Sequence, residues 1–202
     1  MRRTRIIQAV GIIIALALFV SGWYTAYDKS TDLNESTCLG CIALNPIVSP
    51  FSEFWVEYPK GYSREGNVPH PQWVIDELNK GKVVMLFYWT HGCVPCKKQW
   101  DDMKKAEIVD GSESNGYTGK RYENNITLFS IDAGTGEGGD TLKIYTPKNK
   151  EPVTPTTVIL TMKNGSVLWY AFQGPADGTG GRPSIEKLEE ILNDAIKVRD
   201  DK

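Results

Sequence analysis

Residues 82 to 103 hold the feature that most constrains the fold: an apolar strand is followed at once by a helix that begins with two cysteines. The run K-V-V-M-L-F-Y-W is almost continuously apolar, which is typical of a central strand covered on both faces. After Cys93, the residues Cys96, Trp100 and Met103 recur on one helical face, and charged residues fill most of the other positions. The pattern therefore predicts that Cys93 lies at the amino terminus of a helix, directly after a buried strand.

This placement gives the two sulfurs different chemistry. Exposed N–H groups and the helix dipole stabilise a thiolate at a helix start, so Cys93 is predicted to have a lowered pKa and to be the attacking sulfur. Pro95 falls in the first helical turn, where it leaves no N–H unsatisfied. Cys96 falls on the buried face and is expected to stay protonated until it resolves a mixed disulfide. The alternatives are an inert disulfide and half of a zinc site.

The remaining pattern predicts a mixed α/β domain. A helix is expected over 71–81, a strand over 126–132, a β-hairpin that turns at Asn164-Gly165, and a closing amphipathic helix from Ser184 to Val198. Strands that alternate with helices indicate a mixed sheet with helices on both faces. His70, between two prolines, is expected to be part of a turn.

A glycine-rich stretch at residues 134–139 formally matches the dinucleotide-binding pattern G-x-G-x-x-G. The context does not fit, because Glu137 and Asp140 would repel a pyrophosphate and only a short segment follows before Pro147. We expect a flexible surface loop there, followed by a short helix around residues 142–145. A second loop, rich in glycine, serine and asparagine, is expected over residues 110–125.

Two motifs give the chain a resemblance to the thioredoxin superfamily over about residues 68–200. W-T-H-G-C-V-P-C-K after an apolar strand looks like that family's active-site segment, and V-T-P-T before a strand looks like its cis-proline loop. The resemblance implies a thioredoxin-like mixed sheet flanked by helices, with Cys93 as nucleophile and Cys96 as resolving thiol. It also implies that Pro155 is a cis proline facing the disulfide, that Thr154 offers backbone hydrogen bonds to an extended substrate, and that Trp89 packs beneath the site. The Val-Pro dipeptide between the cysteines is similar to that of membrane-tethered thioredoxin-like reductants.

The chain departs from the family at three positions. Thioredoxins carry a buried aspartate that takes the proton of the resolving thiol, and Phe87 occupies the matching position here. Leu128 stands in place of the lysine that usually accompanies that aspartate. His91 lies just ahead of the motif, where it is either a solvated loop residue or a helper of the thiolate.

The amino terminus predicts a membrane anchor. Three arginines precede an apolar run from Ile6 to Tyr24, and a helix of that length spans about 28 Å, close to the thickness of a hydrocarbon core. The alternative is a cleaved signal peptide, but no A-x-A pattern follows Val20 and aromatic residues end the run. We therefore expect an uncleaved anchor within residues 1–27, with its basic end in the cytoplasm and the rest outside. A stalk and aromatic extension (28–67) and the thioredoxin-like domain (68–202) follow.

The second cysteine pair, Cys38 and Cys41, lies in the stalk. Its simplest interpretation is a local disulfide, and the functional alternative is an accessory dithiol that passes electrons between a membrane partner and Cys93. A zinc site made of both pairs is a third interpretation. The two pairs are separated by about fifty residues, however, against about 15 to 20 in a zinc ribbon.

These observations together predict a membrane-anchored thiol-disulfide oxidoreductase that reduces protein disulfides outside the cytoplasm. The alternatives are an oxidase or isomerase of the same fold, or a zinc-stabilised or redox-inactive binding module. A net charge of −2 with interleaved charges gives no reason to expect nucleic acid as a partner. The expected partners are protein disulfides or dithiols, the membrane and a membrane electron donor, and no cofactor or metal ion is predicted.

Overall fold

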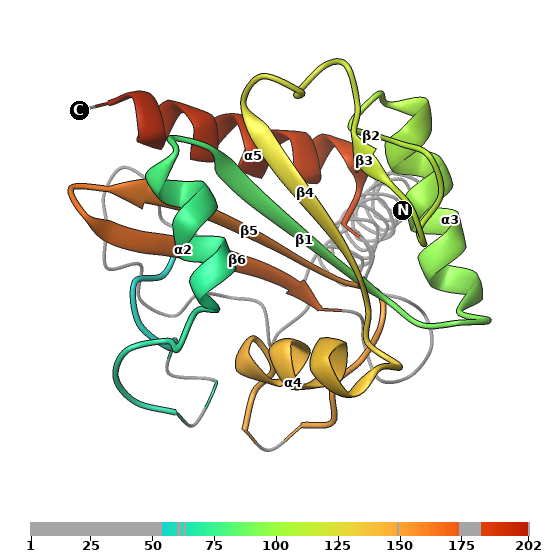
Figure 1. The fold of residues 1–202 in the computed structure, drawn as a ribbon, viewed down its shortest axis with the longest axis horizontal. Helices are drawn as coiled ribbons and strands as arrows, with labels where there is room; N and C mark the ends of the chain where they lie inside the picture. The colour runs from blue at the N-terminus through green and yellow to red at the C-terminus, as the bar shows by residue number, and fades with distance from the viewer. Residues whose placement is uncertain (1–53, 60–61, 63, 149, 174–182, 202) are drawn as a thin grey trace, which may run out of the picture. The chain divides into compact units, whose positions relative to one another are not determined.

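A four-stranded mixed sheet forms the centre of the computed structural model (Figure 1). The strands are β1 (Val83–Trp89), β4 (Ile126–Asp132), β5 (Thr156–Lys163) and β6 (Ser166–Gln173), in the order β4-β1-β5-β6. Strand β1 pairs with β4 in parallel and with β5 in antiparallel fashion, and β5 and β6 form the predicted hairpin. The structure describes residues 54–59, 62, 64–148, 150–173 and 183–201.

The central position of β1 follows from its composition. Its first six residues are buried and only Trp89 is partly exposed, so both faces of the strand are covered, as the apolar run predicts. The hairpin turns at Asn164 and Gly165, which both have positive φ values, of 51° and 78°. This is the conformation that asparagine and glycine tolerate best in a two-residue turn.

Helices cover both faces of the sheet, so the predicted mixed α/β class is confirmed. The helices are α2 (Gln72–Asn79), α3 (Val94–Lys105), α4 (Gly136–Ile144) and α5 (Ile185–Asp200). On one face, α3 packs through Trp100 against Phe87 of β1, and α5 accepts a hydrogen bond at its Ala195 carbonyl from Thr161 of β5. On the other face, Trp73 of α2 packs against Phe129 of β4, with ring centroids 4.6 Å apart.

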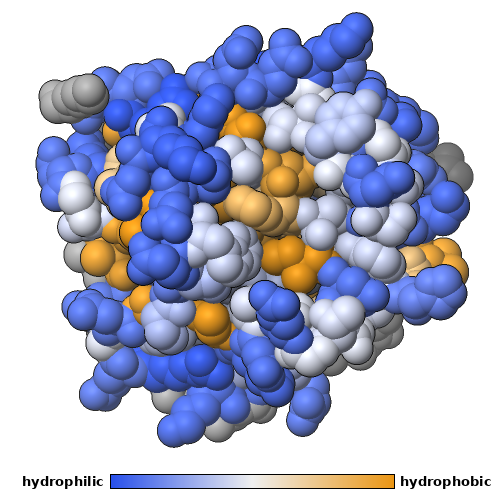
Figure 2. All heavy atoms as spheres, in the orientation of Figure 1, coloured by the Kyte–Doolittle hydropathy of each residue, from blue (hydrophilic) through white to orange (hydrophobic). Residues whose placement is uncertain are grey.

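Strand β4 is an edge strand of this sheet, and six of its seven residues are partly exposed. In the orientation of Figure 2, apolar side chains lie between hydrophilic ones near the centre of the molecule's face. Phe129 and Ile131 of β4 are apolar residues that are only partly buried. Helices α2 and α4 lie on this side of the sheet (Figure 1).

The glycine-rich stretch is not a flexible loop, and that prediction was wrong. Helix α4 begins at Gly136, because the Thr135 hydroxyl accepts a hydrogen bond from the Gly138 N–H at 3.1 Å and caps the first turn. A side chain at Gly138 would place its Cβ 2.1 Å from the Asp132 carbonyl oxygen, so glycine permits a close contact between helix and strand. Gly138 therefore serves packing here.

The segment predicted as a loop over residues 110–125 also contains regular structure. Strands β2 (Val109–Asp110) and β3 (Tyr117–Thr118) pair in antiparallel fashion and form a separate two-stranded sheet. The turn between them packs over Trp100, since a Cβ at Gly116 would lie 2.1 Å from that indole ring. Such short strands leave almost no periodicity for a sequence pattern to reveal.

Aromatic residues of the extension pack on the domain. The Trp55 N–H donates to the Trp169 carbonyl at 2.8 Å, and the reciprocal bond measures 2.9 Å, so the extension adds an antiparallel bridge beside β6. The Trp55 ring lies edge-on to Trp169 with centroids 4.8 Å apart, and Tyr58 and Tyr62 pack on the same indole. Trp55, Tyr62 and Trp169 are all at most 4% exposed, and the extension thus belongs to the hydrophobic core.

The predicted membrane anchor and the Cys38/Cys41 pair lie outside the described residues. Within the ranges that the structure describes, each helix is too short or too polar to cross a membrane. The anchor and the two predicted boundaries between the three segments stay predictions.

His70 contacts the domain core and is not simply a turn residue. Its Nδ1 lies 3.1 Å from the Tyr145 hydroxyl, and burial lowers the pKa of His70 from 6.5 to about 4. Burial also raises the pKa of Tyr145 well above its usual value, so that hydroxyl stays protonated and can donate to a neutral His70. The fold therefore holds His70 in its neutral form.

We predict that the free energy of unfolding falls as the pH is lowered from about 6.5 to about 4. In that window His70 is protonated in the unfolded chain but not in the folded one. The free energy of unfolding therefore falls by at most about 3 kcal/mol. Urea unfolding of the wild type and of His70→Gln across this pH range measures the effect. The part of the pH dependence due to His70 should vanish in the variant, and identical profiles for the two proteins would contradict the prediction.

Candidate active site

Cys93 is the N-cap residue of helix α3, as the sequence predicts. Its Sγ accepts a hydrogen bond from the Cys96 N–H at 3.1 Å, and its own N–H donates to the Thr90 carbonyl at 3.1 Å. Gly92 has a φ of 76°, which lets the chain turn from β1 into the helix. The sulfur of Cys93 therefore lies at the positive end of the helix dipole, where a thiolate is stabilised.

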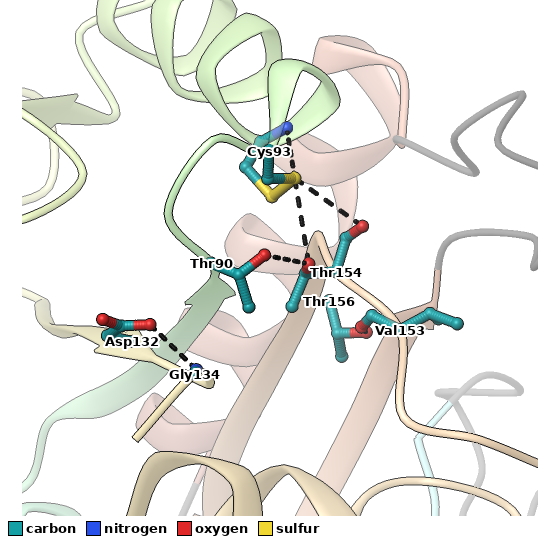
Figure 3. Close-up of a disulfide and its surroundings, with 8 residues drawn as sticks. Thr90, Cys93, Asp132, Gly134, Val153, Thr154 and Thr156 are labelled. Atoms are coloured by element: carbon teal, nitrogen blue, oxygen red, sulfur yellow. Dashed lines mark hydrogen bonds between the residues drawn. A yellow bond between two sulfur atoms is a disulfide. The ribbon is translucent and has the colours of Figure 1, made fainter.

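Cys93 and Cys96 form a disulfide, and they differ in exposure (Figure 3). Cys96 is 1% exposed and faces the core, whereas Cys93 is partly exposed and its neighbour Val94 is 76% exposed. An incoming sulfur can therefore approach Cys93 far more easily than Cys96. The order of attack and resolution predicted for the two thiols agrees with this difference.

The loop before β5 lies opposite the disulfide. The Thr154–Pro155 peptide bond is cis, the conformation that the resemblance implies. The Thr154 carbonyl oxygen and the Thr154 hydroxyl each lie 3.8 Å from the Cys93 Sγ (Figure 3). The structure thus brings together Cys93, Cys96, Thr154 and Pro155, while a role for the last two in substrate binding stays a prediction.

Two hydroxyls meet beside the disulfide, and sequence reasoning did not identify one of them. The Thr90 Oγ1 lies 3.0 Å from the Thr154 Oγ1, although the two residues are 64 positions apart (Figure 3). Thr90 follows the last residue of β1, and Thr154 lies two residues before the start of β5. Only the antiparallel pairing of these two strands reveals that their side chains meet.

Phe87 is the residue that the resemblance sets at the position of the thioredoxin carboxylate. It is fully buried, and its ring centroid lies 5.4 Å from that of Trp100. Leu128 is in register with Met85 and partly buried, so this position also carries an apolar side chain. The side chains at these two positions cannot accept a proton from Cys96.

A buried polar pair lies near Phe87 and was also missed. Gln99, one helical turn after Cys96, donates from its Nε2 to the Thr157 hydroxyl at 2.9 Å, and the two side chains are at most 3% exposed. Thr157 is in register with Phe87 across the β1–β5 pair. The signal in the sequence was a glutamine on the apolar face of α3, three residues after Cys96.

Three further residues surround the site. Trp89 ends β1, its carbonyl accepts from the Ala133 N–H at 2.8 Å, and its indole N–H has no hydrogen-bond partner among the described residues. His91 is exposed on the turn before Cys93. Asp132, at the end of β4, accepts a hydrogen bond from the Gly134 N–H at 2.8 Å (Figure 3).

No group of three or more His, Cys, Asp or Glu side chains in the described ranges is placed to hold a metal ion. Cys38 and Cys41 lie outside those ranges, so the structure does not place them relative to Cys93.

Comparison with known proteins finds a structural likeness but no sequence match. No family model and no curated protein matches the chain. Among solved structures, the chain is similar to a thioredoxin from Thermus thermophilus, at 24% sequence identity and a TM-score of 0.40. The match covers 64% of this chain and 85% of that thioredoxin.

The order of the sheet, its flanking helices, the disulfide at the start of α3 and the cis bond before Pro155 make up the thioredoxin-like fold that the resemblance implies. A close cysteine pair in such a fold supports a thiol-disulfide oxidoreductase.

We predict that Cys93→Ser abolishes disulfide exchange with a model substrate, whereas Cys96→Ser traps mixed disulfides through Cys93. The reason is that only Cys93 combines an exposed sulfur with a hydrogen bond from the helix start. Non-reducing electrophoresis with mass spectrometry identifies the trapped cysteine. Equal alkylation rates of the two thiols in the reduced wild type at neutral pH would count against the assignment.

Proposed function

We propose that this chain is a membrane-anchored thiol-disulfide oxidoreductase that reduces protein disulfides outside the cytoplasm. The observation that carries the proposal is the position of Cys93. Its sulfur is partly exposed, accepts the Cys96 N–H at the start of α3, and lies opposite the Thr154 carbonyl. A structural disulfide needs neither the helix start nor the open approach.

The reaction begins with the reduced protein. The Cys93 thiolate attacks one sulfur of a substrate disulfide, a mixed disulfide forms, and the other substrate sulfur leaves as a thiolate that takes up a proton. Cys96 then loses its proton and attacks the Cys93 sulfur. The Cys93–Cys96 bond forms, the second substrate sulfur leaves, and two electrons have passed to the substrate. An external dithiol must reduce the pair again.

The direction and location of this chemistry rest on the sequence. The Val-Pro dipeptide between the cysteines is similar to that of membrane-tethered reductants, which favours reduction over oxidation or isomerisation. The apolar run at 6–24 with its basic flank supports an anchor with the domain outside. Regeneration by a membrane electron donor, directly or through Cys38 and Cys41, would suit a domain held at the membrane surface.

Turnover by the full-length chain tests the function. With a chemical dithiol as electron source, we expect catalysed reduction of a protein disulfide by the wild type and by Glu190→Ala, an exposed control on α5. Cys93→Ser should be inactive, because no thiolate remains to attack. Reduction by the wild type at the uncatalysed rate would refute the function, and catalysed oxidation of substrate dithiols without reduction would assign the oxidase.

The same assay tests the stalk pair. Replacing both Cys38 and Cys41 by serine removes an accessory dithiol, so turnover driven by a membrane fraction should fall if they act as a relay, while turnover driven by the chemical dithiol should not change. Equal turnover in both assays, together with a Cys38–Cys41 bond found by mass spectrometry, would leave these residues as a local disulfide.

We predict that Phe87→Asp speeds the resolving step near neutral pH by about tenfold or more. A carboxylate there can accept the proton of Cys96, and general bases commonly contribute more than this to a proton transfer. Burying the carboxylate costs stability on the order of a few kcal/mol, so unfolding is measured alongside.

Single-turnover release of the mixed disulfide measures the resolving step, and Phe87→Asn is the matched control that adds polarity without a base. Equal rates for the Asp and Asn variants would contradict the role assigned to the carboxylate. A wild-type rate that does not depend on pH would show that another base already acts on Cys96.

A further inference from the structure

The hydroxyls of Thr90 and Thr154 form two successive contacts that end at the attacking sulfur. The Thr90 and Thr154 Oγ1 atoms are 3.0 Å apart, and the Thr154 Oγ1 lies 3.8 Å from the Cys93 Sγ, within reach of a sulfur hydrogen bond (Figure 3). Both contacts are partly buried, so water competes less for these groups than at an open surface. Neither contact involves the backbone groups of α3 that also face this sulfur.

The number of hydroxyl protons fixes the direction of the hydrogen bond between Thr90 and Thr154 when Cys93 is a thiolate. Each hydroxyl has one proton to donate, and in the disulfide form the weakly accepting sulfur leaves the direction of the Thr90–Thr154 bond open. A thiolate is a far stronger acceptor and draws the Thr154 proton towards it. The Thr154 oxygen then has only lone pairs left for its neighbour, so Thr90 must be the donor.

Because the Thr154 carbonyl also faces the Cys93 sulfur, the orientation of the Thr154 hydroxyl affects the stability of the thiolate. The carbonyl oxygen also lies 3.8 Å from the Cys93 Sγ, and a carbonyl oxygen favours a protonated thiol over a thiolate. One residue therefore presents two opposing groups to the same sulfur. The balance between them depends on whether the Thr154 hydroxyl points at the sulfur, and Thr90 is the side chain in contact with that hydroxyl.

We propose that Thr90 is a positioning residue, which holds the Thr154 hydroxyl as a hydrogen-bond donor to the Cys93 sulfur in the reduced protein. The inference rests on the proposed function, because it takes Cys93 as the attacking thiolate. Thr90 does not touch the reacting sulfur by its side chain and acts through Thr154. Loss of the Thr90 hydroxyl makes the Cys93 thiolate less stable, which raises the pKa of Cys93, and it leaves the stability of the disulfide form unchanged.

The test compares Thr90→Val, Thr90→Ser, Thr154→Val and the double valine variant in the reduced full-length chain. The pH profile of alkylation, followed by mass spectrometry of the peptide that contains Cys93, gives the pKa of that thiol. We expect each single valine variant to raise this pKa by about 0.5 to 1 unit, while Thr90→Ser keeps the wild-type value. The double variant should match Thr154→Val alone, because Thr90 then has no hydroxyl to orient.

A second readout is the equilibrium of the Cys93–Cys96 pair with glutathione. A less stable thiolate makes the reduced form less stable, so Thr90→Val should shift the equilibrium threefold to tenfold towards the disulfide, or about 15 to 30 mV. A purely structural effect of the valine would appear as altered unfolding without this shift.

An unchanged Cys93 pKa in Thr90→Val would overturn the inference. It would also be overturned if Thr90→Val raised this pKa as much in the Thr154→Val protein as in the wild type, because Thr90 would then act without Thr154. A wild-type Cys93 pKa at or above that of free cysteine would show that the protein does not stabilise a Cys93 thiolate, and the inference would then be wrong. Failure of the proposed function is separate, because it appears as absent turnover in the wild type whatever the pKa values are.

Discussion

The burial of strand β1 between two layers of helices is the constraint on which the site depends. Because β1 is covered on both faces, it must lie in the middle of the sheet, with β4 on one side and β5 on the other. The antiparallel register sets Tyr88 opposite Thr156, so the end of β1 lies beside the start of β5. Cys93 and Thr154, 61 residues apart, meet for this reason.

The aromatic extension covers part of the exposed edge of the same sheet. Strand β6 is an edge strand, and unpaired edges invite association with other chains. The bridge between Trp55 and Trp169 pairs part of that edge, and the rings around it cover apolar surface that the four strands alone leave open. Close to the extension along the chain, burial keeps His70 neutral beside Tyr145.

Sequence patterns predicted the parts of the fold whose signals are local. The apolar run of β1, the Asn164-Gly165 turn and the Ser184 cap each predicted an element close to its observed bounds. Helix α4 was predicted too short, only around residues 142–145, because the glycines before it suggest a loop, and the role of Gly138 appears only in its contact with Asp132. The position of Cys93 at a helix start could be predicted from a local pattern. The Thr90–Thr154 and Gln99–Thr157 pairs join residues far apart in the chain, and no local pattern predicts such contacts.

The reduction potential of the Cys93–Cys96 pair in the full-length chain tests the central claim most directly. A reductant of this fold should lie near the value of about −270 mV typical of thioredoxin. We predict a reversible couple close to that value. A potential near about −120 mV would make the protein an oxidant, and one well below about −300 mV would mark an inert structural disulfide, and either result would contradict a function in disulfide reduction.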